Sequence, residues 1–176
     1  MTRYSRLLLL AAAFAISLGS ARAAGPLVDR GKYLTDIIPC TDCHTPGSFL
    51  GHPDMSRYLG GSDVGFSVPG LGVFYGSNLT PDKDTGLGKW SVEEIAAAIT
   101  EGIASDGRKL APPMPSEWFH HLKKEDALAI GFYLKTLKPV SYKVPGPFGP
   151  TQQPVGFVMQ VVPADKFVPP PAPPGR

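Results

Sequence analysis

The sequence predicts a small all-α protein whose helices are joined by long loops rich in glycine and proline. Three segments repeat apolar residues at helical spacing, over 27–38, 92–102 and 124–138. Glycine and proline each occur 20 times in 176 residues, while 43% of residues are hydrophobic, an ordinary level that does not indicate disorder. We therefore expect one helical domain over 24–140, preceded by a targeting segment over 1–23 and followed by a proline-rich tail over 141–176.

The first 23 residues have the layout of a secretory signal peptide. Arg3 and Arg6 form a basic start, residues 7–18 are apolar, and Ala21 and Ala23 are small residues at the two positions that determine cleavage. The apolar stretch of about 12 residues is short for a membrane span, although an uncleaved anchor is the alternative. We expect cleavage after Ala23, a periplasmic location in a bacterium, and no transmembrane helix in the mature chain.

The charge balance of the mature chain indicates no nucleic-acid partner. Cleavage removes three arginines, so the 17 basic residues become 14 against 15 acidic residues, and the net charge changes from +2 to −1. A nearly neutral domain lacks the basic surface that attracts phosphate backbones.

Each predicted helix has local signals for its ends or its packing. The first leads directly into Cys40, the second starts at a capping box over 91–94 and stops at Gly102, and the third ends before Pro139. Glycine costs about 1 kcal/mol relative to alanine inside a helix. Gly31 and Gly131 are therefore expected to allow close approach between the first and last helices.

The residues that carry chemistry are Cys40, Cys43 and His44, which form a C-x-x-C-H motif. Two thiols at this spacing can form thioethers to the vinyl groups of a haem, and the adjacent imidazole can bind its iron. A disulfide or a redox dithiol leaves the histidine unexplained, and zinc needs two further ligands for which no spacing is present. The motif predicts one covalent haem c, with a thiol-redox site as the main alternative.

The sixth iron ligand is expected to be Met114, which lies in a segment stiffened by three prolines at 112, 113 and 115. Proline fixes its own φ and favours extended geometry in the preceding residue, so such a loop should present the thioether rigidly. Met55 is only 11 residues beyond His44, and core packing is the simpler expectation for Met159. His120 and His121 are weaker rivals, and Met114 as a core residue is the other possibility.

The segment over 51–89 is too long for a bare loop, so we expect a loose hairpin or an ordered lobe over one edge of the haem. Asn78 and Trp90 are candidates to hydrogen-bond the haem propionates, with ordinary turn and core roles as the alternative. In the tail, residues 155–162 predict one short strand. We expect residues 139–165 to wrap a partner subunit, so that truncation after Val140 leaves the haem spectrum unchanged.

Together these motifs resemble a class I cytochrome c. Gly31 and Tyr133 are similar to the glycine and aromatic pair that cross in that fold. The segments over 75–82, 85–91, 112–115 and 133–140 resemble single haem modules of periplasmic dehydrogenase cytochrome c subunits, which accept electrons from alcohol, aldehyde or sugar dehydrogenases. The resemblance covers residues 27–145. It implies a dehydrogenase as electron donor and a downstream cytochrome or terminal oxidase as acceptor.

The expected function is electron transfer without catalysis, with His44 and Met114 as the two iron ligands. Methionine ligation and burial raise the reduction potential of a haem, which suits it to accept electrons from a dehydrogenase. The alternative is a haem enzyme or a gas or redox sensor, which requires an open iron position.

Overall fold

The computed structural model describes residues 25–169, so the predicted signal peptide lies outside the described residues. The described part of the chain begins with a helix over 25–37, which is followed by α2 (Cys40–His44), α3 (Val92–Glu101), α4 (Ser116–Phe119) and α5 (Lys124–Thr136). Three short 3-10 helices are η1 (Ser48–Leu50), η2 (Met55–Arg57) and η3 (Ala164–Lys166). Over this range no helix is both long and apolar enough to cross a membrane.

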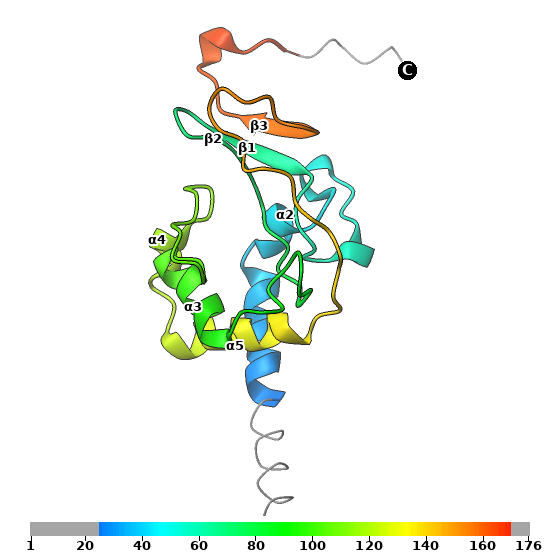
Figure 1. Cartoon of the computed structure of the whole chain (residues 1–176), viewed down its shortest axis with the longest axis vertical. Coiled ribbons are helices and arrows are strands. Elements are labelled where there is room, and N and C mark those ends of the chain that lie inside the picture. The colour runs from blue at the N-terminus through cyan, green and yellow to red at the C-terminus, as the bar shows by residue number, and fades with distance from the viewer. Residues whose placement is uncertain (1–24, 170–176) are drawn as a thin grey trace, which may run out of the picture.

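The all-α prediction is wrong, because the described residues also contain a three-stranded mixed sheet. Strands β1 (Val64–Val68) and β2 (Gly72–Tyr75) form an antiparallel hairpin, and β3 (Phe157–Gln160) pairs with β1 in parallel, giving the order β2-β1-β3. Figure 1 shows the sheet at one end of the molecule and helices α3 and α5 at the other. The sequence predicts a hairpin within 51–89 and a strand within 155–162, and both are present. It does not predict that they pair with each other in one sheet.

The N-terminal helix crosses α5 at Gly31, as expected. A β-carbon at Gly31 would lie 1.9 Å from the carbonyl oxygen of Ala129 and 2.8 Å from Cβ of Tyr133, so only glycine fits this crossing. Gly131 has a different partner: it faces Val92 of α3, whose Cγ1 lies 3.0 Å from the position of an added β-carbon. The expectation that both glycines serve the first helix therefore holds for Gly31 alone.

Helix α3 begins and ends where its sequence signals place it. The hydroxyl of Ser91 accepts from the amide of Glu94, the Glu94 carboxylate accepts from the amide of Ser91, and Gly102 closes the helix in a left-handed conformation with φ of 67°. Helix α5 ends at Thr136, two residues earlier than predicted. The core between these helices consists of seven buried side chains: Leu34, Leu59, Leu87, Ile95, Ile130, Tyr133 and Leu134.

Part of the proline-rich tail packs against the domain. The amide of Tyr142 donates to Thr85 Oγ1 at 3.1 Å, and Phe148 forms a β-bridge with Val73. Since β3 also joins the sheet of the same chain, the segment over 140–160 is part of this fold.

Candidate functional site

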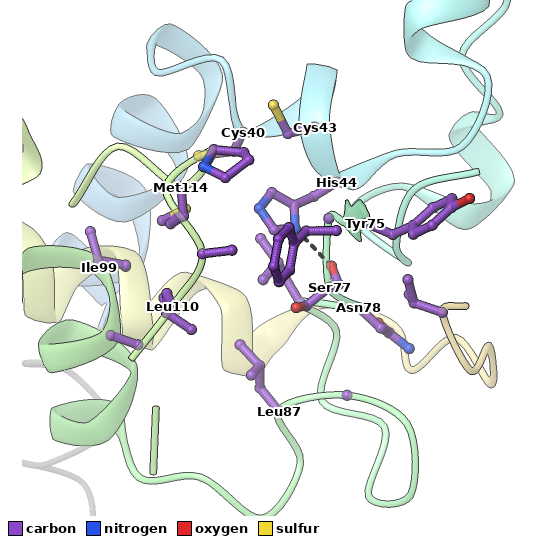
Figure 2. A pocket seen from close by; sticks show the side chains of 18 of the residues that line it. Cys40, Cys43, His44, Tyr75, Ser77, Asn78, Leu87, Ile99, Leu110 and Met114 are labelled. Atoms are coloured by element: carbon purple, nitrogen blue, oxygen red, sulfur yellow. Dashed lines mark hydrogen bonds between the residues drawn. The ribbon is translucent and has the colours of Figure 1, made fainter. Parts of the chain in front are cut away.

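The residues predicted from sequence meet at one cavity of about 680 Å³ between α2, α3, α5 and the tail. Its wall contains all six candidates, namely Cys40, Cys43, His44, Asn78, Trp90 and Met114. Most of the remaining wall is apolar, including Phe66, Leu79, Leu87, Ile99, Leu110 and Leu134. Figure 2 shows Leu87, Ile99 and Leu110 among them. The volume lies within the range of about 300–1,000 Å³ that is usual for cofactor sites.

The C-x-x-C-H motif forms the short helix α2, which other segments hold in place through its backbone. The carbonyl of His44 accepts from the amide of Gly61 at 2.8 Å. At Gly76 the strand end packs so closely that an added β-carbon would lie 1.6 Å from the carbonyl oxygen of Cys43. Gly76 therefore has a positioning role that its sequence context does not reveal.

The imidazole of His44 is oriented by a backbone group. Its Nδ1 lies 2.7 Å from the carbonyl oxygen of Ser77, as the dashed line in Figure 2 shows. Because a carbonyl oxygen can only accept a hydrogen bond, Nδ1 carries the proton and Nε2 keeps its free electron pair. This is the tautomer that a metal-binding histidine needs. Burial lowers the pKa of His44 and the bond to Ser77 raises it, with burial the larger effect.

The two cysteines are thiols in an apolar environment. Burial raises the pKa of Cys40 to about 11 and also raises the pKa of Cys43. Thiols of redox-active C-x-x-C sites have lowered pKa values, because the thiolate is the reactive form. This environment does not favour the thiol-redox alternative.

Met114 is the one methionine among the described residues that lines this cavity. Met55 and Met159 are 59% and 41% exposed and lie outside the wall, so Met159 is not the core residue that its apolar neighbours suggested. The segment before Met114 is a turn rather than the expected extended segment, since the amide of Met114 donates to the carbonyl of Ala111 at 3.0 Å. In Figure 2, Met114 lies to one side of His44, with Ser77 and Asn78 to the other.

Asn78 lines the cavity, but its side chain is engaged by protein groups. Its Nδ2 donates to the carbonyl of Val140 at 2.7 Å and to Thr85 Oγ1 at 3.0 Å, and its Oδ1 accepts from the amide and the hydroxyl of Thr80. With 2% of its surface exposed, Asn78 joins the tail to the cavity wall. These bonds favour the core role that the sequence left open over a contact with a propionate.

The loop that carries Trp90 is held by a lysine at the end of α5. Nζ of Lys135 donates to the carbonyls of Leu87, Gly88 and Trp90 at 3.1, 3.0 and 2.9 Å. Leu87 and Trp90 both line the cavity, so Lys135 positions this part of the wall. The sequence contains no local signal for this contact, which joins residues 45–48 positions apart.

The cavity is also lined by two cationic side chains that were not predicted from the sequence. These are Arg108 and Lys143. Neither belongs to a recognisable motif, and Lys143 lies in the segment predicted to be a separate tail. Residues 143–147 all contribute to the wall. Guanidinium and ammonium groups are the donors that carboxylates prefer, so these two side chains would suit the propionates of a bound haem better than Asn78 would.

The residues at this site fit a haem c. The cavity has an apolar wall, two cations, two thiols and an oriented imidazole from one five-residue helix, and a thioether from a separate loop. This donor set matches covalent attachment with histidine and methionine as iron ligands. The fold and the site thus define a c-type cytochrome module.

Comparison with known proteins gives the same class. The chain is 33% identical over 137 residues to the cytochrome c subunit of a quinone alcohol dehydrogenase from Gluconobacter oxydans, covering 76% of this chain and 27% of the relative. It is 35% identical over 138 residues to the fructose dehydrogenase cytochrome subunit of Gluconobacter japonicus, covering 78% of this chain and 26% of the relative. It is 32% identical over 126 residues to the gluconate 2-dehydrogenase cytochrome c subunit of Pantoea cypripedii, covering 71% of this chain and 26% of the relative.

The chain spans about a quarter of the length of these relatives. No protein-family model matches it. The chain is a cytochrome c module similar to those of dehydrogenase cytochrome subunits, and the resemblance predicted from its motifs is confirmed.

Proposed function

We propose that this protein is a periplasmic electron carrier that holds one covalent haem c. Cys40 and Cys43 attach the haem, and His44 and Met114 are its axial ligands. The protein takes electrons from a dehydrogenase and passes them to a downstream cytochrome or terminal oxidase of the respiratory chain. The observation that supports this most is the presence of Met114, alone among the described methionines, in the wall that contains the C-x-x-C-H helix.

Bound haem c supplies one-electron redox chemistry, and the chain sets how easily it occurs. Nδ1 of His44 donates to Ser77, which fixes the ring orientation and increases the basicity of Nε2. The Met114 thioether and the apolar wall both stabilise the reduced state over the oxidised state. If His44 and Met114 both bound the iron, no position would be left for a substrate, which supports electron transfer over catalysis.

A direct test uses the purified holoprotein with host dehydrogenases. We expect the oxidised protein to show the red absorption band of methionine-to-iron charge transfer. We also expect the haem to be reduced when a dehydrogenase is supplied with its alcohol, aldehyde or sugar substrate. A high-spin spectrum that shifts on adding azide would instead identify an enzyme or sensor with an open iron position.

The mass of the mature protein tests export and haem count together. We expect a chain that begins at about Ala24 and keeps the mass of one haem after extraction with acidified acetone. Loss of the haem on extraction would contradict covalent attachment, and an intact N-terminus would contradict cleavage.

A further inference from the structure

The segment over 155–168, here called the apolar arm, exposes an unusual amount of hydrophobic surface. It contains half of the large hydrophobic side chains that are exposed in the described residues. These are Val155, Phe157, Val158, Met159, Val161, Val162, Phe167 and Val168, which are 39% to 88% exposed. No Asp, Glu, Lys or Arg occurs from 144 to 164.

The arm is attached to the domain by regular contacts. Strand β3 pairs with β1 in the register Val64 with Phe157 and Phe66 with Met159. The hydroxyl of Tyr75 donates to the carbonyl of Val155. Since β3 is an edge strand in the order β2-β1-β3, its outer side offers backbone groups for a further contact.

The arm also lies beside the haem cavity. Phe66, the β1 residue in register with Met159, is part of the cavity wall, and so is Tyr75 of β2. A protein that covered the arm would therefore be one strand away from the wall of the redox site. Figure 1 shows the arm running along the sheet end of the molecule, away from α4 and α5.

The size of the arm fits a stable interface. The eight side chains are 39% to 88% exposed, and those in β3 alternate between the two faces of the strand, so a partner would have to wrap around the arm to cover them all. Covered in this way, they would contribute on the order of several hundred Å² toward the roughly 800 Å² that one partner supplies to an interface of standard size. Monomeric soluble proteins rarely expose an apolar patch of more than a few hundred Å².

We propose that the apolar arm is the surface by which this protein is permanently held on the dehydrogenase subunit that reduces it. The partner surface is uncharged and apolar, because the arm has almost no charge to complement. The arm lies one strand away from the wall of the haem cavity, which favours the redox partner over a second copy of this chain as its occupant. The inference rests on the proposed function and adds the surface and the kind of contact.

The test uses the full mature holoprotein and the dehydrogenase found by substrate-driven haem reduction. The double variant Val161→Asp with Val168→Asp introduces charge at two highly exposed positions outside β3, so the sheet is untouched. Phe157→Asp tests the strand itself. The matched control is Trp118→Asp on α4, an equally exposed hydrophobic residue away from the arm. Every variant is checked for an unchanged haem spectrum.

We expect both arm variants to bind the dehydrogenase at least about 100-fold more weakly, or about 2.7 kcal/mol. The reduction rate at saturating dehydrogenase should stay unchanged, and the control should bind like the wild type. Wild-type affinity should change less than about threefold between low and high salt, because contacts without charge are not screened.

Two results would overturn the proposal while leaving the proposed function intact. One is an arm variant that binds as tightly as the wild type, above all if Trp118→Asp does not. The other is a wild-type dimer that the arm variants convert to monomers with no loss of dehydrogenase affinity. A wild-type haem that no dehydrogenase reduces would instead overturn the proposed function, and the docking proposal with it.

Discussion

At the scale of single residues, Met114 is the test of the iron site. Replacing Met114 with alanine should keep the haem attached through Cys40 and Cys43 but remove the red charge-transfer band. The reduction potential should fall, because the thioether that favours ferrous iron is gone. Azide binding should appear, since one axial position is then open. Absorption spectroscopy and a redox titration measure all three effects.

Two methionine variants serve as controls for that experiment. Met55→Leu and Met159→Leu alter side chains that lie outside the cavity wall, so the band should remain. If the band survives in Met114→Ala and disappears in either control, the ligand assignment is wrong, although the electron-carrier function would stand.

Lys135 is a second residue with a specific role, through its three bonds to carbonyls of the 87–90 loop. Lys135→Met should lower the free energy of unfolding by about 2 kcal/mol, the range for hydrogen bonds to a charged group. Denaturant unfolding of the holoprotein measures this change. Lys138→Met, at an exposed position just beyond the end of α5, should have little effect, and equal losses in both variants would refute the positioning role.

At the scale of elements, the crossing of the first helix and α5 depends on Gly31. Gly31→Ala should destabilise the protein by about 3 kcal/mol, the upper end for overpacking, because the added methyl group meets backbone rather than a side chain that can move. The matched control is Gly25→Ala in the same helix, where an added β-carbon meets nothing within 4 Å. The control should be neutral or stabilising by up to about 1 kcal/mol.

The same two helices are joined by an ion pair that makes their contact sensitive to pH. Arg30 Nε lies 2.8 Å from Asp126 Oδ1, and the hydrogen bond from Arg30 lowers the pKa of Asp126 below its ordinary value. A carboxyl with a lowered pKa stabilises the fold above its unfolded pKa, and this contribution is lost as the pH falls through the folded pKa.

Asp126→Asn should therefore have a lower melting temperature than the wild type at pH 7. The difference should shrink as the pH falls below the ordinary aspartate pKa of about 4 and vanish below the lowered pKa of the folded state, where the wild-type carboxyl is itself protonated. Asp29→Asn, at an exposed position in the first helix, should follow the wild type throughout. A difference for Asp126→Asn that persists at the lowest pH would show that charge is not its cause.

At the scale of the whole molecule, the C-terminal segment has two roles that truncation can separate. Ending the chain after Val140 removes residues 143–147 from the cavity wall, so the haem should become accessible to azide and the spectrum should change. This replaces the expectation from sequence that such a truncation leaves the spectrum intact. Ending the chain after Pro154 keeps that wall and removes the apolar arm, so the spectrum should persist. Identical spectra for both truncations would contradict the assignment of 143–147 to the site.

The sequence predicts the site better than the fold. Cys40, Cys43 and His44 lie within five consecutive residues, so the haem-binding motif can be recognised from the sequence without a structure. Met114 is marked by its prolines, although these form a turn and not the expected extended segment. By contrast, Arg108, Lys143 and Gly76 carry no local pattern, and only the folded chain brings them to the cavity.

The haem motif and the capping box of α3 can be predicted from the sequence, because each depends on residues within one or two turns of one another. Gly31 is predicted as a crossing glycine without a local contact to confirm it, since its partners Ala129 and Tyr133 lie about 100 residues away. The sheet, the partner of Gly131 and the packing of the tail depend on contacts that form only in the folded chain. Strands β1 and β2 are short and rich in glycine, and β3 lies about 90 residues further along the chain. Pairing over such a distance is selected by burial and hydrogen bonding in the folded chain, which no local periodicity records.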